Sequence, residues 1–400
     1  MSSYHLRCRV CEEVIDAEPL DACRRCDGPA DVTYDWERAA RLLTRDGIAA
    51  GPQSLWRYHG LLPAGARVDV GAGWTPLRRS PELSDLLGVD LHLKLEDENP
   101  TRSYKDRVAT IAVSAALDHG VTTLCCSSTG NLGDAVAAAA SATGLEAVVL
   151  VPAGSPSAAV VAAHPGVHVF AVRGTYDDCR RLELELGSLF PWGFVSGNLH
   201  PFASEGAKTI SFEIAEQLDW QLPDAVVCPA ASGTLFSKLT QGFAELTRIG
   251  LAAEPVPRMF AAQALGSSPI AAAFADDRNI SRVLAATDVA SLAVGDPSAG
   301  DLALGAARAT GGAVVAIAED EIVAYTELLS ELTGVTPDLS GGAALGALMA
   351  GVRRGELEPG SRVVLVVTGA QPQQKVSDGT HVTTIDPDAD DVLAALGLGS

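Results

Sequence analysis

The stretch Asn99-Pro-Thr-Arg-Ser-Tyr-Lys-Asp-Arg107 decides how the rest of this sequence is interpreted. It follows a strand-like apolar run, Leu91 to Leu95, and precedes a segment whose apolar residues recur with helical spacing. Pro100 disfavours helix at the residue before it, and Ser103 can cap a helix that begins just after it. We therefore expect Lys105 near a helix N-terminus, where the helix dipole opposes protonation of its amine. Such a lysine suits Schiff-base chemistry; the alternative is an ordinary solvated charge.

Composition limits the class of protein. The chain has 400 residues, 47% of them hydrophobic and 20% charged, which fits a compact soluble enzyme with two domains. The formal net charge of -21 argues against nucleic acid and anionic membranes as partners. We find no signal-peptide pattern and no apolar run of about 20 residues. These features predict a cytoplasmic enzyme.

Two CxxC pairs open the chain, Cys8 with Cys11 and Cys23 with Cys26. Two such pairs separated by a short polar loop are typical of a zinc ribbon, because four thiolates can surround one tetrahedral metal ion. With all four positions filled by cysteine, the zinc would be structural. Two disulfides or four free thiols are the alternatives. We assign residues 1–36 to a zinc-ribbon-like segment.

Two strand–turn–helix patterns carry polar residues where a ligand would bind. The first has a strand over 122–126, a turn over 127–131 and a helix over 132–143; a further strand over 147–151 completes a βαβ unit. The second has a strand over 225–228, a turn over 229–235 and a helix to residue 248. Open parallel sheets bind ligands at the carboxyl ends of their strands. A Gly-containing turn before a helix is suited to hold phosphate, although plain helix starts would explain both patterns.

The last predicted strand spans 362–367 and ends at Thr368, which again places a hydroxyl at a strand end. Beyond residue 386 the chain is acidic, with a short helix-like apolar segment over 392–398. We expect residues 386–400 to form a tail that either docks onto a partner subunit or frays.

Several of these segments resemble, in the same order, the motifs of the threonine synthase family of pyridoxal-phosphate (PLP) enzymes. The resemblance covers nearly the whole chain, from about residue 8 to residue 369. The matching blocks are Trp56-Arg57-Tyr58, Gly71 to Leu77, Asn99 to Arg107, Ser128 to Asn131, Glu205 to Thr209, Ser291 to Pro297, and Thr368-Gly369.

The resemblance implies an α/β protein of fold type II, similar to the tryptophan synthase β subunit, with two open parallel-sheet domains and an N-terminal zinc-ribbon-like knuckle. We expect a large PLP domain over 37–107 and 196–385, and a smaller inserted domain over 108–195. Fold type II enzymes are commonly dimers, so a homodimer is expected.

The resemblance also implies roles for individual residues. Lys105 would bind PLP covalently and move protons. The other cofactor contacts would be Asn131 to the ring hydroxyl oxygen, Thr368 to the pyridine nitrogen, and Ser232, Gly233 and Thr234 to the phosphate. Ser128 and Thr129 would bind the substrate carboxylate. The implied reaction converts O-phospho-L-homoserine and water to L-threonine and phosphate.

The sequence departs from the family in places that concern the substrate. Ala203 stands where many members have an arginine, Ser232 replaces an asparagine, and the pattern after Gly369 is lost over residues 370–375. The remaining candidates for the substrate phosphate are Asn198, Lys208, His200 and Arg102. The chain could therefore be a paralogue that performs β-replacement or β-elimination on another activated amino acid, as cysteate or cysteine synthases do. A non-catalytic relative is the third possibility.

Overall fold

The computed structural model describes residues 4–20, 22–370 and 381–398. The chain forms two compact units, each of which is described by itself. The first unit comprises Met1–Ala72, Lys105–Gly206 and Pro372–Ser400. The second unit comprises Gly73–Tyr104 and Ala207–Gln371.

A five-stranded sheet with strand order β14-β8-β7-β6-β9 forms the centre of the first unit, and all its strand pairs are parallel. Its strands are β6 (Thr123–Ser127), β7 (Glu146–Pro152), β8 (Val167–Val172), β9 (Gly193–Phe194) and β14 (Val382–Ile385). All five residues of β6 and the central residues of β7 are buried. Continuous apolar burial of this kind is what a parallel sheet covered on both faces requires.

Helices cover this sheet. They are α4 (Lys105–Asp118), α5 (Asn131–Thr143), α6 (Ala158–Val161), α7 (Tyr176–Leu189), α8 (His200–Ala203) and α15 (Ala389–Ala395). Both α5 and α7 pack on β6 and β7, and α4 packs on α5. The helix α9 (Glu205–Gln217) begins in this unit and continues in the second. Thr175 and Asp178 form a capping box at the start of α7.

The N-terminal segment of the first unit is an antiparallel sheet with strand order β2-β1-β3. Its strands are β1 (Tyr4–Cys8), β2 (Val14–Ile15) and β3 (Ala30–Tyr34). The helices α1 (Trp36–Leu42) and α2 (Arg45–Ala49) and the 3-10 helix η1 (Leu55–Leu61) follow. This small sheet carries the CxxC pairs at its turns.

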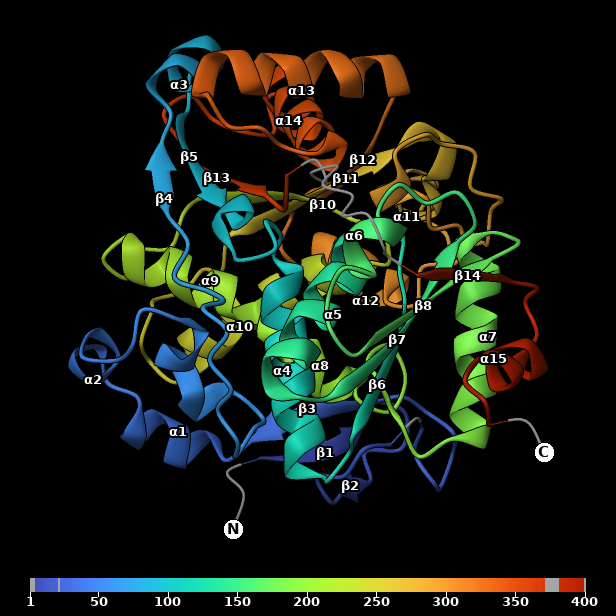
Figure 1. Ribbon diagram of the computed structural model, residues 1–400. Helices are drawn as coiled ribbons and strands as arrows, with labels where there is room; N and C mark the ends of the chain where they lie inside the picture. Colours follow the sequence, from blue (N-terminus) through green and yellow to red (C-terminus); the bar gives the residue numbers. More distant parts are fainter. Residues whose placement is uncertain (1–3, 21, 371–380, 399–400) are drawn as a thin grey trace. The chain divides into compact units, whose positions relative to one another are not determined.

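The C-terminal segment is part of the first unit and does not form the expected tail. The strand β14 pairs in parallel with β8, and Figure 1 shows α15 beside α7. Ile385, Ala389 and Val392 are buried in one cluster with Cys179 and Leu182 of α7. The segment docks onto its own chain because these apolar residues share one face, and the acidic residues between them remain at the surface.

The second unit is built on a six-stranded sheet with strand order β12-β11-β10-β13-β5-β4. Its strands are β4 (Leu77–Arg79), β5 (Asp90–Leu95), β10 (Ala225–Pro229), β11 (Arg258–Ala264), β12 (Ala313–Ile317) and β13 (Arg362–Val367). Only β4, at the edge, runs antiparallel to its neighbour within this sheet. The core residues of β5, β10 and β13 are almost all fully buried.

The second unit also contains α3 (Pro81–Leu87), η2 (Glu96–Glu98), α10 (Thr234–Arg248), η3 (Leu265–Ser267), α11 (Pro269–Ala275), η4 (Ala290–Leu292), α12 (Gly300–Ala309), α13 (Glu319–Thr333) and α14 (Leu339–Arg353). Helix α14 packs on β10, β11 and β13, and α13 packs along α14, as Figure 1 shows. Gly342 and Gly346 permit this close approach, because a Cβ at Gly342 would lie 2.0 Å from the Thr326 hydroxyl of α13.

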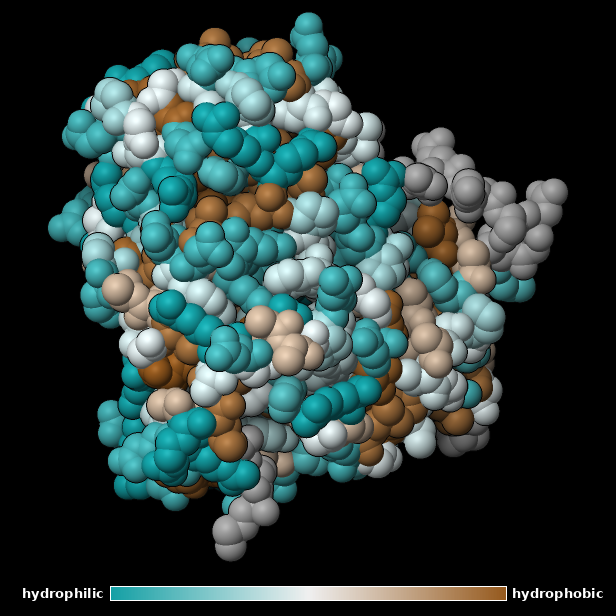
Figure 2. Space-filling view, turned by 90° about the vertical axis from the view of Figure 1, so that its left-hand side faces the viewer, coloured by the Kyte–Doolittle hydropathy of each residue, from teal (hydrophilic) through white to brown (hydrophobic). Residues whose placement is uncertain are grey.

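These two parallel sheets with covering helices confirm the predicted α/β fold class. The first unit contains all of 108–195, the predicted inserted domain. It is larger than that prediction because N-terminal and C-terminal segments of the chain belong to the same unit. No helix in the described residues is long and apolar enough to span a membrane. On the face in Figure 2, hydrophilic residues predominate and hydrophobic residues occur in separate groups.

Candidate functional site

Lys105 is the first residue of α4, as the sequence predicts. The loop before it is fixed to the end of β13. The Tyr104 N–H donates to the Thr368 carbonyl at 3.0 Å, the Ser103 hydroxyl donates to the same oxygen at 3.3 Å, and the Ala370 N–H donates to the Arg102 carbonyl at 3.0 Å. Arg102 has a positive φ of 61°, a left-handed conformation that these contacts must sustain. The lysine therefore leaves a rigid, strained loop.

Within the first unit, the charge of Lys105 reaches two buried groups. Burial raises the pKa of the Cys126 thiol and of the Tyr176 phenol, and the positive charge of Lys105 lowers both pKa values by a smaller amount. Cys126 lies near the carboxyl end of β6, and Tyr176 is the first residue of α7. Lys105 therefore lies near the strand end at which the first predicted turn begins.

Two buried carboxylates hold the predicted Gly71–Leu77 turn. Glu213 accepts hydrogen bonds from the backbone N–H groups of Trp74 and Thr75, and it pairs with the fully buried Lys94 at 2.6 Å. Glu96 accepts from the Thr75 hydroxyl at 2.6 Å and from the Asn99 amide at 2.9 Å. This network could not be predicted from the motif, because the motif contains the residues of the turn but not the distant carboxylates that hold it.

The first predicted binding turn follows β6 and ends at Asn131, the first residue of α5. The hydroxyl of Ser128 is used inside the turn: it accepts from the N–H groups of Gly130 (2.9 Å) and Gly133 (2.8 Å) and donates to the Gly130 carbonyl (3.1 Å). Ser128 is buried, whereas Thr129 and Asn131 are partly exposed. Within the described residues, no hydrogen bond joins the Asn131 side chain to another group, so its amide can bind a ligand.

A second network lies under this turn. Glu183 of α7 accepts from the N–H and the hydroxyl of Ser127, at 3.0 and 2.5 Å, and pairs with Arg180 at 3.1 Å. Their spacing of three residues places Arg180 and Glu183 on one face of α7. That this face meets the end of β6 could not be predicted from the sequence, because it depends on tertiary packing.

The second predicted binding turn has the features of an anion site. Gly233 has a φ of 85°, and a Cβ there would lie 2.6 Å from the Ala299 carbonyl oxygen. Helix α10 follows directly with Gly233 as its N-cap residue, and the Thr234 N–H makes a long bond of 3.5 Å to the Ser232 hydroxyl. The positive end of the helix dipole lies at this turn. The Ser232 hydroxyl lies 3.2 Å from that of Thr234. These residues fit the phosphate of PLP.

Thr368 lies at the end of β13, where its hydroxyl is 2.9 Å from the hydroxyl of Ser340. Ser340 in turn donates to the Asp338 carboxyl at 2.5 Å. Asp338 caps α14, and burial raises its pKa to about 6. The sequence predicts Thr368 at a strand end, but it does not show that Ser340 joins this hydroxyl to Asp338.

Two predicted substrate residues have other roles. The Asn198 side chain is used within its own loop: its oxygen accepts from the Phe194 N–H at 2.8 Å, and its nitrogen donates to the Trp192 carbonyl at 2.9 Å. Lys208 is fully buried and pairs with Glu245 of α10 at 2.7 Å. These contacts disfavour the prediction that Asn198 and Lys208 bind a substrate phosphate, because their polar atoms are engaged by the protein.

The four N-terminal cysteines come together in the first unit. Their sulfur atoms all lie within 4.8 Å of one another, with 3.5 Å between Cys8 and Cys26 and 3.7 Å between Cys11 and Cys23. Zn–S bonds of about 2.3 Å in a tetrahedron place the sulfurs roughly 3.8 Å apart. All eight cysteines of the chain are described and none forms a disulfide. The donor set and its spacing fit a zinc ion.

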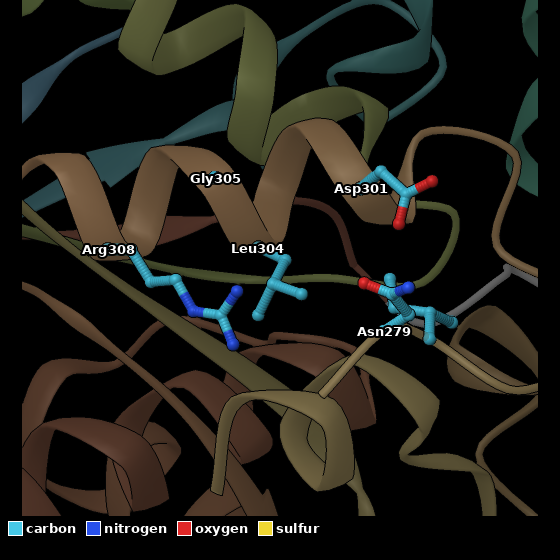
Figure 3. Close-up of a pocket in the computed structure, with 6 residues that line it drawn as sticks. Asn279, Asp301, Leu304, Gly305 and Arg308 are labelled. Carbon is cyan, nitrogen blue, oxygen red and sulfur yellow. The ribbon is translucent and has the colours of Figure 1, made fainter. Parts of the chain in front are cut away.

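A pocket of about 430 Å³ also lies in the second unit, along α12. Figure 3 shows Leu304 and Arg308 pointing into it from the helix, with Asp301 and Asn279 at its other end. Arg308 pairs with the exposed Asp277 at 2.8 Å. None of the predicted cofactor residues lines this pocket, so it is separate from the predicted site.

Comparison with known families decides the class of protein. A family model described as "Pyridoxal-phosphate dependent enzyme" matches residues 68–369. The chain belongs to this family. The match begins just before the Gly71–Leu77 turn and ends at Gly369, so it includes both binding turns and Lys105.

The resemblance to threonine synthases is confirmed by relatives of known name. A threonine synthase of Methanosarcina acetivorans is 32% identical over 98% of each chain. One from Methanocaldococcus jannaschii is 30% identical over 91% of each chain.

Fold type II is confirmed by solved structures. Diaminopropionate ammonia lyase from Escherichia coli has a TM-score of 0.66 at 19% identity, covering 77% of this chain and 87% of that chain. Maize serine racemase has a TM-score of 0.63 at 21% identity, covering 74% and 88%.

Proposed function

We propose that this protein is a threonine synthase, which converts O-phospho-L-homoserine and water to L-threonine and phosphate. The observation that carries this proposal is the 32% identity to a threonine synthase over 98% of both chains. Lys105 at the start of α4, in the middle of the family's lysine motif, gives the proposal its catalytic residue.

In this proposal Lys105 binds the cofactor covalently and moves protons at the reacting carbons. PLP, when bound, supplies an electron sink that stabilises negative charge on the substrate carbons. The helix dipole and the fixed loop over 99–104 support the role of Lys105, since both favour a neutral, positioned amine. The Asn131 amide would orient the cofactor ring, and Thr368 would meet the ring nitrogen.

The phosphate of the cofactor would bind at Ser232, Gly233 and Thr234. The support is the start of α10 at this turn and the positive φ of Gly233. The substrate carboxylate would bind at the turn containing Ser128 and Thr129. Because the Ser128 hydroxyl already bonds backbone groups of that turn, its part would be to shape the turn, and Thr129 would be the direct contact.

The substrate phosphate needs a cation, and we assign Arg102 to it. Asn198 and Lys208 are engaged elsewhere, whereas Arg102 stands three residues before Lys105 on the strained loop. Its guanidinium donates to the Thr336 hydroxyl at 3.0 Å. A guanidinium has five N–H donors, so this bond leaves capacity for a phosphate.

Replacement of this arginine tests the assignment. We expect Arg102→Ala to raise the KM for O-phospho-L-homoserine at least 10-fold, and Arg102→Lys to recover part of the loss. Arg78→Ala is the matched control, because Arg78 makes a similar single bond to Thr333 in the same unit. An unchanged KM in Arg102→Ala would remove Arg102 from the site and leave the rest of the proposal standing.

A second function remains open because two of the residues predicted for the substrate phosphate, Asn198 and Lys208, are engaged elsewhere. A paralogue acting on another activated amino acid, by β-replacement or β-elimination, would keep Lys105, Asn131 and the cradle at 232–234. An assay of phosphate and threonine release separates the two. Equal amounts of both products would establish threonine synthase, whereas cofactor binding without phosphate release would favour the paralogue. A chain that binds no PLP would be a non-catalytic relative.

We also propose a structural zinc ion at Cys8, Cys11, Cys23 and Cys26. Metal analysis of the purified protein should give one zinc per chain, and Cys11→Ser should lower that content. Cys228→Ser is the control, because Cys228 is buried in β10 outside the cluster. Zinc content that does not change in Cys11→Ser would contradict the site.

The remaining expectations concern assembly and location. We expect a homodimer, because fold type II enzymes are commonly dimers. Light scattering of the purified protein tests this expectation. A cytoplasmic location would fit an enzyme of amino-acid biosynthesis, and fractionation of cells tests it.

A further inference from the structure

The N-terminal sheet of the first unit is joined to the start of α9 by a buried hydrogen bond. Tyr34, the last residue of β3, donates its phenol proton to the Glu205 carboxyl at 2.8 Å. Tyr34 is 3% exposed, and Glu205, the first residue of α9, is 0% exposed. Loss of a donor to a buried carboxyl is costly, because no water takes its place. The bond therefore fixes Glu205 to the sheet that carries the cysteines.

The residue after Glu205 contacts the helix of Lys105 directly. A Cβ at Gly206 would overlap the Arg107 carbonyl oxygen and would lie 3.1 Å from the Val108 nitrogen. The backbone at the start of α9 thus lies against the first turn of α4, two residues beyond Lys105. Because no side chain separates the two backbones, a displacement of Glu205 reaches this turn without being absorbed by side-chain rotation.

Aromatic rings of the same sheet support the other end of α4. Tyr4 of β1, opposite Tyr34 in the antiparallel register, packs edge-on against Phe202 of α8 with 6.3 Å between the ring centroids. Phe202 in turn lies 5.8 Å from the ring of His119, which directly follows α4. Helix α8 packs on both α4 and β3, and the three lie together in Figure 1. The sheet therefore supports α4 near both ends, and the Tyr34 bond acts at the end that carries Lys105.

We propose that Tyr34 is a positioning residue that acts through Glu205 to hold the first turn of α4, and with it the amine of Lys105, against the cofactor. The inference rests on the proposed function, in which Lys105 binds PLP. In that step the neutral amine adds to the aldehyde carbon of PLP, and water leaves as the C=N bond forms. A displacement of the nucleophile by about 1 Å is enough to slow such a step strongly.

The test compares two tyrosines of the sheet. Tyr34→Phe removes the phenol that binds Glu205 and keeps the ring. Tyr4→Phe is the matched control, because Tyr4 packs on Tyr34 and Phe202, and its hydroxyl has no hydrogen-bond partner in the described part of the chain. Apoprotein is mixed with saturating PLP and reduced with borohydride at successive times, and mass spectrometry gives the rate of labelling at Lys105.

We expect the labelling rate to fall by about 5-fold or more in Tyr34→Phe and to stay within about 2-fold of the native rate in Tyr4→Phe. A bond that served only to stabilise the fold would lower the free energy of unfolding and leave the labelling rate unchanged. A native labelling rate in Tyr34→Phe, or an equal loss in the two variants, would overturn the inference.

Hydrogen exchange in the apoprotein measures the same effect without cofactor. The backbone amides of the first two turns of α4 should exchange about 10-fold faster in Tyr34→Phe than in the native protein. The amides of α7, which packs on β6 and β7, should keep their native rates in the same sample. Native exchange rates in α4, or faster exchange throughout the unit, would contradict a local effect on α4.

The route through Glu205 is tested by combining substitutions. Glu205→Ala should slow the labelling of Lys105 at least as much as Tyr34→Phe, and the double variant should be no slower than Glu205→Ala, because both substitutions remove the same bond. Effects that multiply in the double variant would overturn the inference. That result would leave Lys105 as the attachment site, so the proposed function would stand. No label on Lys105 in the native protein would overturn both.

Discussion

The two binding turns of this protein look alike in sequence and differ in what their serines do. Each lies between a buried parallel strand and a helix, and each has a serine two or more residues before the helix. In the first unit the Ser128 hydroxyl bonds two N–H groups of its own turn. In the second unit the Ser232 hydroxyl lies 3.2 Å from the Thr234 hydroxyl and accepts from one N–H group, that of Thr234, at 3.5 Å. The first turn is closed by two short bonds from its own serine, whereas the serine of the second turn holds one N–H group through a long bond.

This difference shows that a Ser/Gly turn before a helix does not by itself identify a phosphate site. The deciding feature is whether the N–H groups at the helix start already have partners. A substitution in the second turn should therefore weaken PLP binding more than folding. Loss of the serine in the first turn should lower mainly the free energy of unfolding.

The largest expected effect is on the second turn. Gly233→Ala places a Cβ 2.6 Å from the Ala299 carbonyl oxygen at a φ of 85°, so the turn must move. We expect PLP affinity to fall more than 100-fold, measured by equilibrium titration of the apoprotein. Gly250→Ala is the control: it also has a positive φ, at the other end of α10, but a Cβ there meets nothing within 4 Å. It should cost about 1 kcal/mol of stability and leave PLP affinity unchanged.

The second effect separates the two serines. Ser128→Ala leaves two buried N–H groups without their acceptor, which should lower the free energy of unfolding by about 2 kcal/mol in denaturant titration of the apoprotein. Ser232→Ala should change that free energy by less than about 0.5 kcal/mol and weaken PLP binding by about 5-fold. The comparison fails if the Ser128 variant keeps native stability while the Ser232 variant loses it.

The start of α14 extends the comparison to a helix whose N-cap residue is an acid. Asp338 caps α14, and its pKa is raised to about 6 by burial. The folded protein therefore binds a proton more tightly than the unfolded chain, and this group adds stability as the pH falls from 8 to 5. The gain should be about 1 kcal/mol, and it should be absent in Asp338→Asn. Unfolding titrations at the two pH values measure it; an equal gain in the variant would assign the effect to other groups.

Much of this organisation could be predicted from local sequence. Lys105 follows a proline-containing loop that ends one element and starts another, and this local signal places it at the start of α4. The two turns were found because glycine and hydroxyl residues mark a strand–helix junction wherever it occurs.

The contacts that assign roles come from distant parts of the chain. The sequence suggests Lys208 as a ligand because its partner, Glu245, lies on another helix, far away in the chain. Asn198 looked available because its bonds to Phe194 and Trp192 depend on how the loop closes. The docking of α15 on α7 and the bond from Ser340 to Thr368 likewise depend on tertiary packing, which motif spacing does not contain.

The central claim is that Lys105 carries the cofactor, and one measurement tests it most directly. The protein is mixed with PLP, reduced with borohydride, digested and examined by mass spectrometry. We predict one pyridoxyl group per chain, on the peptide that contains Lys105, and none in Lys105→Ala. A label on Lys94, Lys208 or Lys238, or no label on the native protein, would contradict the account.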